Sequence, residues 1–186
     1  MGYPIWDVAI GGPLLMALVA IPHVIVSHFA IGGGLLIALT ETLAVRRGDP
    51  ELRALAKRSS LVLILVSTVF GAISGVGIWV VAGLVSPGAI SALIHTYVWG
   101  WAIEWVVFVL EIVAALVYYT TWDRISKGAH LLVGWLYFVA AYLSLVVING
   151  IITFMLTPGR WLATGAFWDG FFNPTYWPSL VLRTGL

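Results

Sequence analysis

Four long apolar runs constrain this chain more than any other feature of its sequence. They occupy about residues 12–43, 61–85, 97–121 and 131–156. Each run is long enough to cross a bilayer as a helix, which takes about 20 mostly apolar residues. Charged residues make up 9% of the chain, whereas a soluble domain has roughly a quarter. The sequence therefore predicts an all-α, polytopic membrane four-helix bundle, and it excludes a soluble globule, a disordered chain and a nucleic-acid-binding protein.

The segment at residues 157–186 has a different character. It is rich in aromatic residues, and glycine and proline interrupt it at Gly165, Gly170, Pro174 and Pro178. It is too short and too broken to span, so we expect either an interfacial aromatic tail or a surface that packs on a partner. Because the chain has no cysteine, disulfides and thiolate metal sites are excluded. We expect a single membrane domain over residues 1–186.

Basic residues lie mostly between the runs on one side of the predicted bundle. Seven of the nine Lys and Arg residues fall in two predicted loops: Arg46, Arg47, Arg53, Lys57, Arg58, Arg124 and Lys127. Short loops rich in Lys and Arg stay in the cytoplasm. We therefore expect this side to be cytoplasmic, with the N-terminus and the tail on the other side.

Ionisable side chains within membrane spans are costly and mark functional sites by default. His23 lies roughly 16 Å into the first run and Glu104 roughly 10 Å into the third, both counted from the non-cytoplasmic side at 1.5 Å per residue. An imidazole and a carboxylate at similar depth on two helices can hold a metal or a haem iron between them. The alternative is a direct His–Glu hydrogen bond between the helices, and spacing alone slightly favours that alternative.

Glu111 follows Glu104 by seven residues, so both carboxylates share one face of the third predicted helix. Two buried carboxylates on one stripe suit a proton relay, because burial disfavours their ionised forms and each can exchange a proton with water. The alternative is a pair of structural carboxyl groups that bond neighbouring helices. We therefore assign Glu104 and Glu111 a proton-transfer role.

His28 is five residues beyond His23, and it lies about 140° around the helix from it. It therefore faces a different direction. It either binds a second haem or bonds a neighbouring helix, and the sequence favours neither.

Several segments, taken together, resemble subunit I of the cytochrome bd quinol oxidases. They are ALVAIPHVIVSHFAIGGGLLIALTET at Ala17–Thr42, GAISG from Gly71, AIEWVVFVLE at Ala102–Glu111, WDRISKGAHLLVGWL at Trp122–Leu136, Asn149-Gly150, and FFNP at Phe171–Pro174. They resemble the first four helices of that family, and the start of the segment before the fifth, in order and in the same orientation.

The resemblance implies a role for each matching residue. His23 matches the histidine that ligates the high-spin haem at the oxygen site, and Glu104 matches the glutamate on the other side of that iron. Glu111 matches a second glutamate that is tied to proton delivery, although its spacing from Glu104 is one residue shorter than in the family. His130 matches a loop histidine that is not an iron ligand. The cofactors implied are haem b, another haem shared with a partner, and a quinone.

The sequence also departs from the family pattern. The family chain is more than twice as long, and its later helices carry the low-spin haem ligands and the quinol-binding loop. The low-spin histidine is expected near Leu182–Arg183, and neither residue can serve. We therefore expect either half of a split subunit or a reduced bd-like subunit, with other membrane subunits supplying the missing ligands.

The favoured interpretation is a haem-binding electron-transfer subunit of a larger respiratory complex in the bacterial cytoplasmic membrane. It would pass electrons between haem and either quinone or a c-type cytochrome. Two alternatives come from other classes of function: a non-redox scaffold that kept the bd fold without haem, and a proton channel or transporter built on Glu104 and Glu111.

Overall fold

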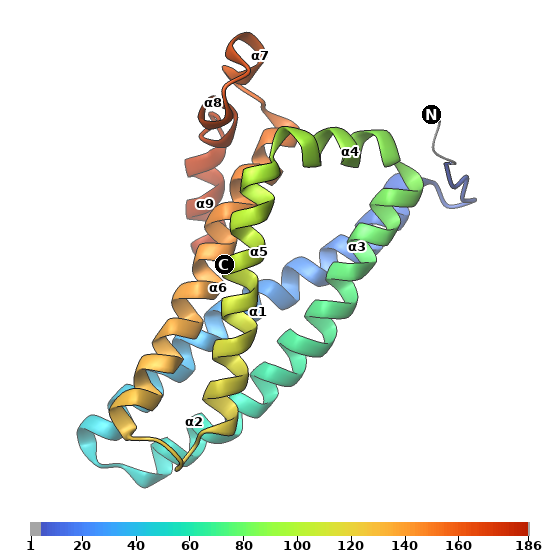
Figure 1. Cartoon of the computed structure of the whole chain (residues 1–186). Helices are drawn as coiled ribbons and strands as arrows, with labels where there is room; N and C mark the ends of the chain where they lie inside the picture. Colours follow the sequence, from blue (N-terminus) through green and yellow to red (C-terminus); the bar gives the residue numbers. More distant parts are fainter. Residues whose placement is uncertain (1–4, 186) are drawn as a thin grey trace.

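The computed structural model describes residues 5–185, and within that range the chain is almost entirely helical (Figure 1). The elements are α1 (Gly12–Arg47), α2 (Pro50–Ile64), the π-helix η1 (Leu65–Gly71), α3 (Ala72–Val85), α4 (Pro87–Thr96), α5 (Val98–Thr120), α6 (Lys127–Leu156), α7 (Trp161–Thr164), α8 (Phe167–Phe171) and α9 (Tyr176–Gly185).

Four helical segments are long and apolar enough to cross a membrane: α1, the continuous stretch α2–η1–α3, α5 and α6. This confirms the predicted all-α fold with four spans. The side of the membrane on which the N-terminus lies remains a prediction.

The first two spans are joined by a shorter turn than the sequence suggested. The segment from Val45 to Ser60, expected as a loop, is helical except at Gly48 and Asp49. Gly48 takes the left-handed conformation that ends α1, and the Asp49 side chain accepts hydrogen bonds from the backbone N–H groups of the first turn of α2. Pro50 is the first residue of α2. Gly directly after a helix is a strong signal for its end, and Asp as N-cap followed by Pro is a strong signal for the start of the next helix. These signals decide the local structure here, although the segment is rich in charged residues.

The helices associate as two pairs that meet at the basic end. α1 packs along α2–η1–α3, and α5 packs along α6, while α1 also packs on α6. Glycines permit close approaches between these helices: a Cβ on Gly34 would lie 2.5 Å from the Tyr137 ring, and one on Gly134 would lie 2.8 Å from the Tyr118 ring. Towards the other end α3 and α5 separate, and α4 runs between them across that end (Figure 1).

The aromatic tail packs on its own chain. Asn149 of α6 is fully buried; its amide donates to the Tyr176 carbonyl at 3.0 Å and accepts from the Ser179 hydroxyl at 2.8 Å. Further along, the hydroxyls of Tyr142 and Thr184 lie 3.3 Å apart. The last helix, α9, therefore runs antiparallel along α6.

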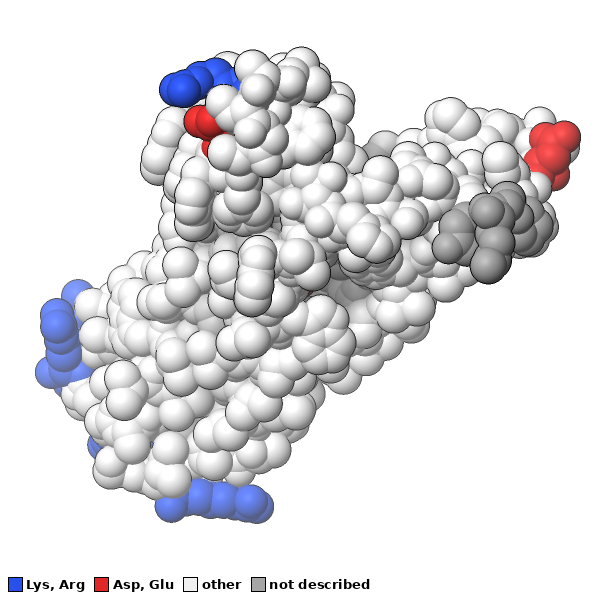
Figure 2. Space-filling view, turned by 45° about the horizontal axis from the view of Figure 1, so that its top comes forward, with Lys and Arg blue, Asp and Glu red and all other residues white. Residues whose placement is uncertain are grey.

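Charge is concentrated at the ends of the molecule. Figure 2 shows Lys and Arg gathered at the end where α1 meets α2 and α5 meets α6, with a broad uncharged surface beyond them. At the opposite end, the described residues form one ion pair: Arg160 lies 3.9 Å from Asp169. This distribution suits a chain whose uncharged middle faces lipid or neighbouring apolar helices.

Candidate functional site

His23 lies on the stripe of α1 that faces the bundle, in line with the buried residues Ala30 and Ile37 one and two heptads further on. Its Nδ1 atom is 3.0 Å from the hydroxyl oxygen of Ser74 on α3. The Ser74 hydroxyl donates its own hydrogen to the Phe70 carbonyl at 2.5 Å. In the tautomer with the hydrogen on Nδ1, the oxygen of Ser74 accepts that hydrogen, and the Nε2 atom of His23 keeps a free lone pair.

The surroundings of His23 are built from small residues. A Cβ on Gly75 would lie 3.1 Å from the Cε1 atom of the His23 ring. The absence of a side chain there lets the ring lie against α3 without distortion. A histidine whose Nδ1 is fixed by a second residue and whose Nε2 is free has the arrangement typical of metal ligands.

Glu104 occupies the equivalent position on the other helix pair. It lies on the stripe of α5 that packs on α6, and it accepts a hydrogen bond from the Ser144 hydroxyl at 3.2 Å. His23 and Glu104 therefore each bond within their own pair, so the direct His–Glu hydrogen bond considered from spacing is not formed. Among residues 5–185 no three His, Cys, Asp or Glu side chains gather as a complete metal site. An iron bound here would need the porphyrin nitrogens as its remaining ligands.

Glu111 borders a small cavity between the two pairs, whose lining surface is mostly apolar. The cavity has a volume of about 60 Å³ and is lined by Ser67, Thr68, Ala72, Phe108, Glu111, Ile112, Ala115 and Tyr137. Such a cavity can hold water when it exceeds about 10–15 Å³ and offers two to four polar partners. The hydroxyl and carboxyl groups of its lining supply those partners. The serine and threonine come from the π-helix η1, an element that is frequent at functional sites.

His28 is half-buried and lies off the stripe of α1 that carries His23. Its Nδ1 atom lies 2.7 Å from the Val24 carbonyl of its own helix, and its Nε2 atom is buried without a hydrogen-bond partner in the described part of the chain. The structure thus does not bring His28 together with His23, as the 140° rotation predicted. Its role as a ligand remains a prediction.

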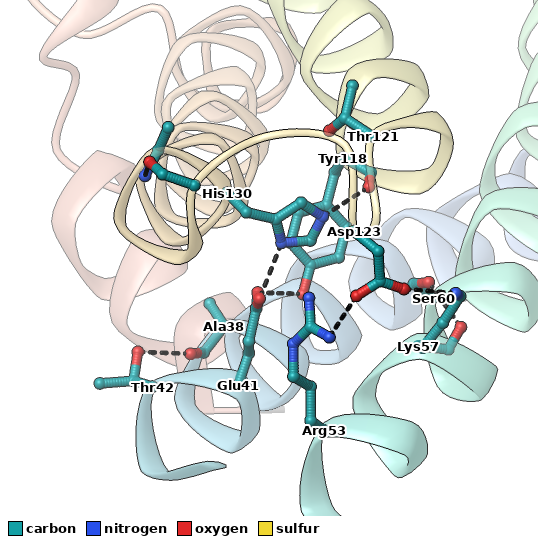
Figure 3. A network of polar contacts seen from close by, with 12 residues as sticks. Ala38, Glu41, Thr42, Arg53, Lys57, Ser60, Tyr118, Thr121, Asp123 and His130 are labelled. Carbon is teal, nitrogen blue, oxygen red and sulfur yellow. Dashed lines mark hydrogen bonds and ion pairs between the residues drawn. The ribbon is translucent and has the colours of Figure 1, made fainter. Parts of the chain in front are cut away.

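The sequence analysis missed a buried polar network at the basic end, shown in Figure 3. Glu41 of α1 is 0% exposed and His130 of α6 is 1% exposed. One carboxylate oxygen of Glu41 lies 2.7 Å from Nδ1 of His130, and the other accepts the Tyr118 hydroxyl at 2.7 Å. The Nε2 atom of His130 donates to the Tyr118 carbonyl at 2.9 Å. The signal that could have revealed the network was a lone acidic residue, Glu41, in an apolar run.

Outside the spans, Asp123 is held between two cations of α2. Its two oxygens accept from Arg53 at 2.5 Å and from Lys57 at 3.1 Å. These hydrogen bonds lower the pKa of Asp123 below its ordinary value. The contribution of these contacts to the stability of the folded protein is therefore present above the ordinary aspartate pKa, and it is lost as the pH falls through the lowered pKa.

We expect the carbon NMR titration of Asp123 to have a lower midpoint in the wild-type protein than in an Arg53→Met, Lys57→Met double variant, because the variant lacks both cations. Equal midpoints in the two proteins would contradict the contacts.

Comparisons with known proteins agree with this architecture. Among solved structures, the fold is similar to "The structure of bd oxidase from Geobacillus thermodenitrificans", with a TM-score of 0.81 and 23% sequence identity. The match covers 93% of this chain and 41% of that chain, so this chain spans about two fifths of its length. At this identity the likeness shows the fold alone. No match is found among curated proteins.

The family comparison covers nearly the whole chain. The sequence matches the family described as "Cytochrome bd terminal oxidase subunit I" over residues 13–184. That range includes the four spans and the helix α9 except for one terminal residue each of α1 and α9. The chain therefore belongs to the cytochrome bd terminal oxidase subunit I family.

Proposed function

We propose that this chain is a haem-b-binding electron-transfer subunit of a larger respiratory membrane complex, in which His23 would hold the iron. The observation that carries the proposal is the hydrogen bond from His23 to Ser74, which leaves Nε2 of His23 free on the bundle-facing stripe of α1. Family membership supports the same assignment, because the family name is that of a terminal oxidase.

The residues present fit a haem. Gly75 leaves the His23 ring uncrowded on α3. Glu104 offers a carboxylate on the opposite pair, and a single hydrogen bond from Ser144 orients it. A bound haem would supply one-electron redox chemistry.

The chain's own groups have distinct roles in this proposal. Ser74 orients the imidazole of His23. Glu104 holds a proton or a negative charge near the site, and Glu111 exchanges a proton with water in the cavity beside it. Two carboxyl groups on one stripe of α5 thus provide proton transfer to accompany electron transfer.

Partners complete the site in this proposal. In this proposal other membrane subunits supply further haem ligands and contacts. Electrons would come from a quinone or a c-type cytochrome. His28, whose Nε2 atom is buried without a hydrogen-bond partner among the described residues, would bind a second haem.

Replacing Ser74 with alanine should weaken haem binding without abolishing it. The variant removes the acceptor that fixes the Nδ1 hydrogen of His23, and loss of such a partner typically costs 10- to 100-fold in metal affinity. Haem titration of the haem-free membrane protein measures the effect. Ser27→Ala is a matched control, because the Ser27 hydroxyl bonds only the backbone of α1, at the His23 carbonyl. Equal affinities in the two variants would contradict the proposed role of Ser74.

The test of the function is a dithionite-reduced minus oxidised spectrum, with a pyridine haemochrome assay, on the purified chain and the subunits that accompany it. We expect a b-type haem. A preparation without haem would overturn the proposal and favour the scaffold. Proton flux into liposomes from a haem-free preparation, lost in Glu111→Gln, would instead favour the proton channel.

A further inference from the structure

Two tryptophan rings meet between the helix pairs at the α4 end of the molecule. Trp79 belongs to α3 and Trp101 to α5, and their ring centroids lie 5.0 Å apart with an angle of 62° between the ring planes. Aromatic rings favour this edge-to-face arrangement, which adds to the stabilisation that comes from their burial. The backbones of α3 and α5 separate towards this end (Figure 1). The two rings therefore connect the helix pairs where the backbones do not.

Helical spacing relates Trp79 to His23. Trp79 follows Gly75 by four residues on α3, so the two positions share one face of that helix. This face is turned to His23, because a Cβ on Gly75 would lie 3.1 Å from the Cε1 atom of the His23 ring. Since α3 runs towards α4, Trp79 lies on the His23 side of α3, one turn nearer to α4 than Gly75.

The same relation holds between Trp101 and Glu104 on α5. Trp101 precedes Glu104 by three residues, and residues three apart are neighbours on a helix surface. Because α5 follows α4 in the chain, Trp101 is one turn nearer to α4 than Glu104. Each ring thus adjoins one of the two groups assigned to the haem site, on the same side of that group. The tryptophan pair, Trp79 and Trp101, therefore lies on the α4 side of both His23 and Glu104.

The two rings are not held equally. Trp101 packs on the buried cluster that includes Tyr97, Leu145 and Ile151, so the α5–α6 pair fixes its position. Trp79 is 44% exposed, and it meets α5 through the Trp101 ring. Replacing Trp79 therefore removes the contact between the helix pairs without opening the buried core.

We propose that the tryptophan pair closes the haem site on its α4 side and slows the release of haem from it. The rings place bulky apolar surface next to both His23 and Glu104, so a haem held there would leave towards α4 only if the rings separate. They also exclude water from that side, and exclusion of water strengthens electrostatic interactions inside a site. Neither ring ligates iron; both are positioning residues. The inference rests on the proposed haem site at His23.

The rate of haem loss tests this role. The purified chain, with its accompanying subunits, is mixed with an excess of apomyoglobin, and haem transfer is followed by absorbance. We expect Trp79→Leu to lose haem about tenfold faster than the wild type, which corresponds to a barrier lowered by about 1.4 kcal/mol. Trp79→Phe keeps an aromatic ring against Trp101 and should restore slow loss. Trp99→Leu is the matched control, because Trp99 is 72% exposed and lies about 160° around α5 from Trp101.

A double variant tests whether the two rings act as a pair. Removing either ring breaks the same contact, so Trp79→Leu with Trp101→Leu should lose haem little faster than the faster single variant. Wild-type loss in a folded Trp79→Leu protein would overturn the inference, and this exposed position decides even if Trp101→Leu does not fold. Effects that multiply in the double variant would also overturn it. A wild-type preparation without haem would overturn the proposed function and this inference together, so the two failures are distinguishable.

Discussion

Replacing His23 with alanine is expected to abolish one b-type haem signal from membranes that contain this chain. The methyl group of alanine cannot ligate iron, and among the described residues no other histidine shares the bundle-facing stripe of α1. The interaction of His23 with Ser74 contributes little to folding, because it is one partly buried hydrogen bond. The protein should therefore fold while it loses the haem, as the reduced minus oxidised spectrum and the pyridine haemochrome assay would show.

The matched control for this variant is His95→Ala. His95 is exposed on α4 and bonds the Ser91 carbonyl of its own helix. It should leave the spectrum unchanged. A His23→Ala protein with the wild-type haem content would exclude His23 as the ligand and would favour a scaffold that kept the fold.

Replacing His130 with leucine is expected to destabilise the folded protein by about 1–3 kcal/mol, the usual cost of leaving a buried hydrogen-bonding group without its partner. The change leaves Glu41 fully buried with only the Tyr118 hydroxyl as a partner, and it leaves the Tyr118 carbonyl without the imidazole. Leucine nearly conserves the volume, so cavity formation adds little. The free energy of unfolding, measured by SDS titration and circular dichroism, gives the effect.

His95→Leu is the corresponding control. It makes the same substitution at an exposed site and should change the free energy of unfolding by less than about 0.5 kcal/mol. Equal stabilities of the two variants would mean that the network at the basic end does not hold α1, α5 and α6 together.

The sequence predicted the four spans because the apolar runs are long and contain few charges, a signal that needs no tertiary information. It misjudged the segment around Gly48 because charge was given more weight than the capping residues. The packing of α9 on α6 could not be predicted, since it depends on Asn149, a single polar residue in an apolar run. Together with the family match, the four apolar helices identify a multi-pass protein of the bacterial cytoplasmic membrane.

Helical periodicity separates His23 from His28 on α1 and places Glu104 and Glu111 on one stripe of α5, whereas the roles of these residues as ligands or proton carriers stay predictions. It did not reveal Ser74 or Ser144, because a serine in an apolar helix usually bonds its own backbone and gives no sign of a distant partner. It also treated His130 as a boundary residue, because its partner Glu41 is 89 positions away in the sequence. Contacts of that kind are set by the register between helices.

The central claim, that His23 is an axial ligand of a haem, is tested most directly by chemical rescue. His23→Gly removes the imidazole and leaves space for a free one. The account predicts that the variant lacks the b-type haem signal and that added imidazole restores haem binding and the reduced spectrum, whereas N-methylacetamide does not. Haem binding by His23→Gly without imidazole, at the wild-type stoichiometry and with the wild-type spectrum, would contradict it.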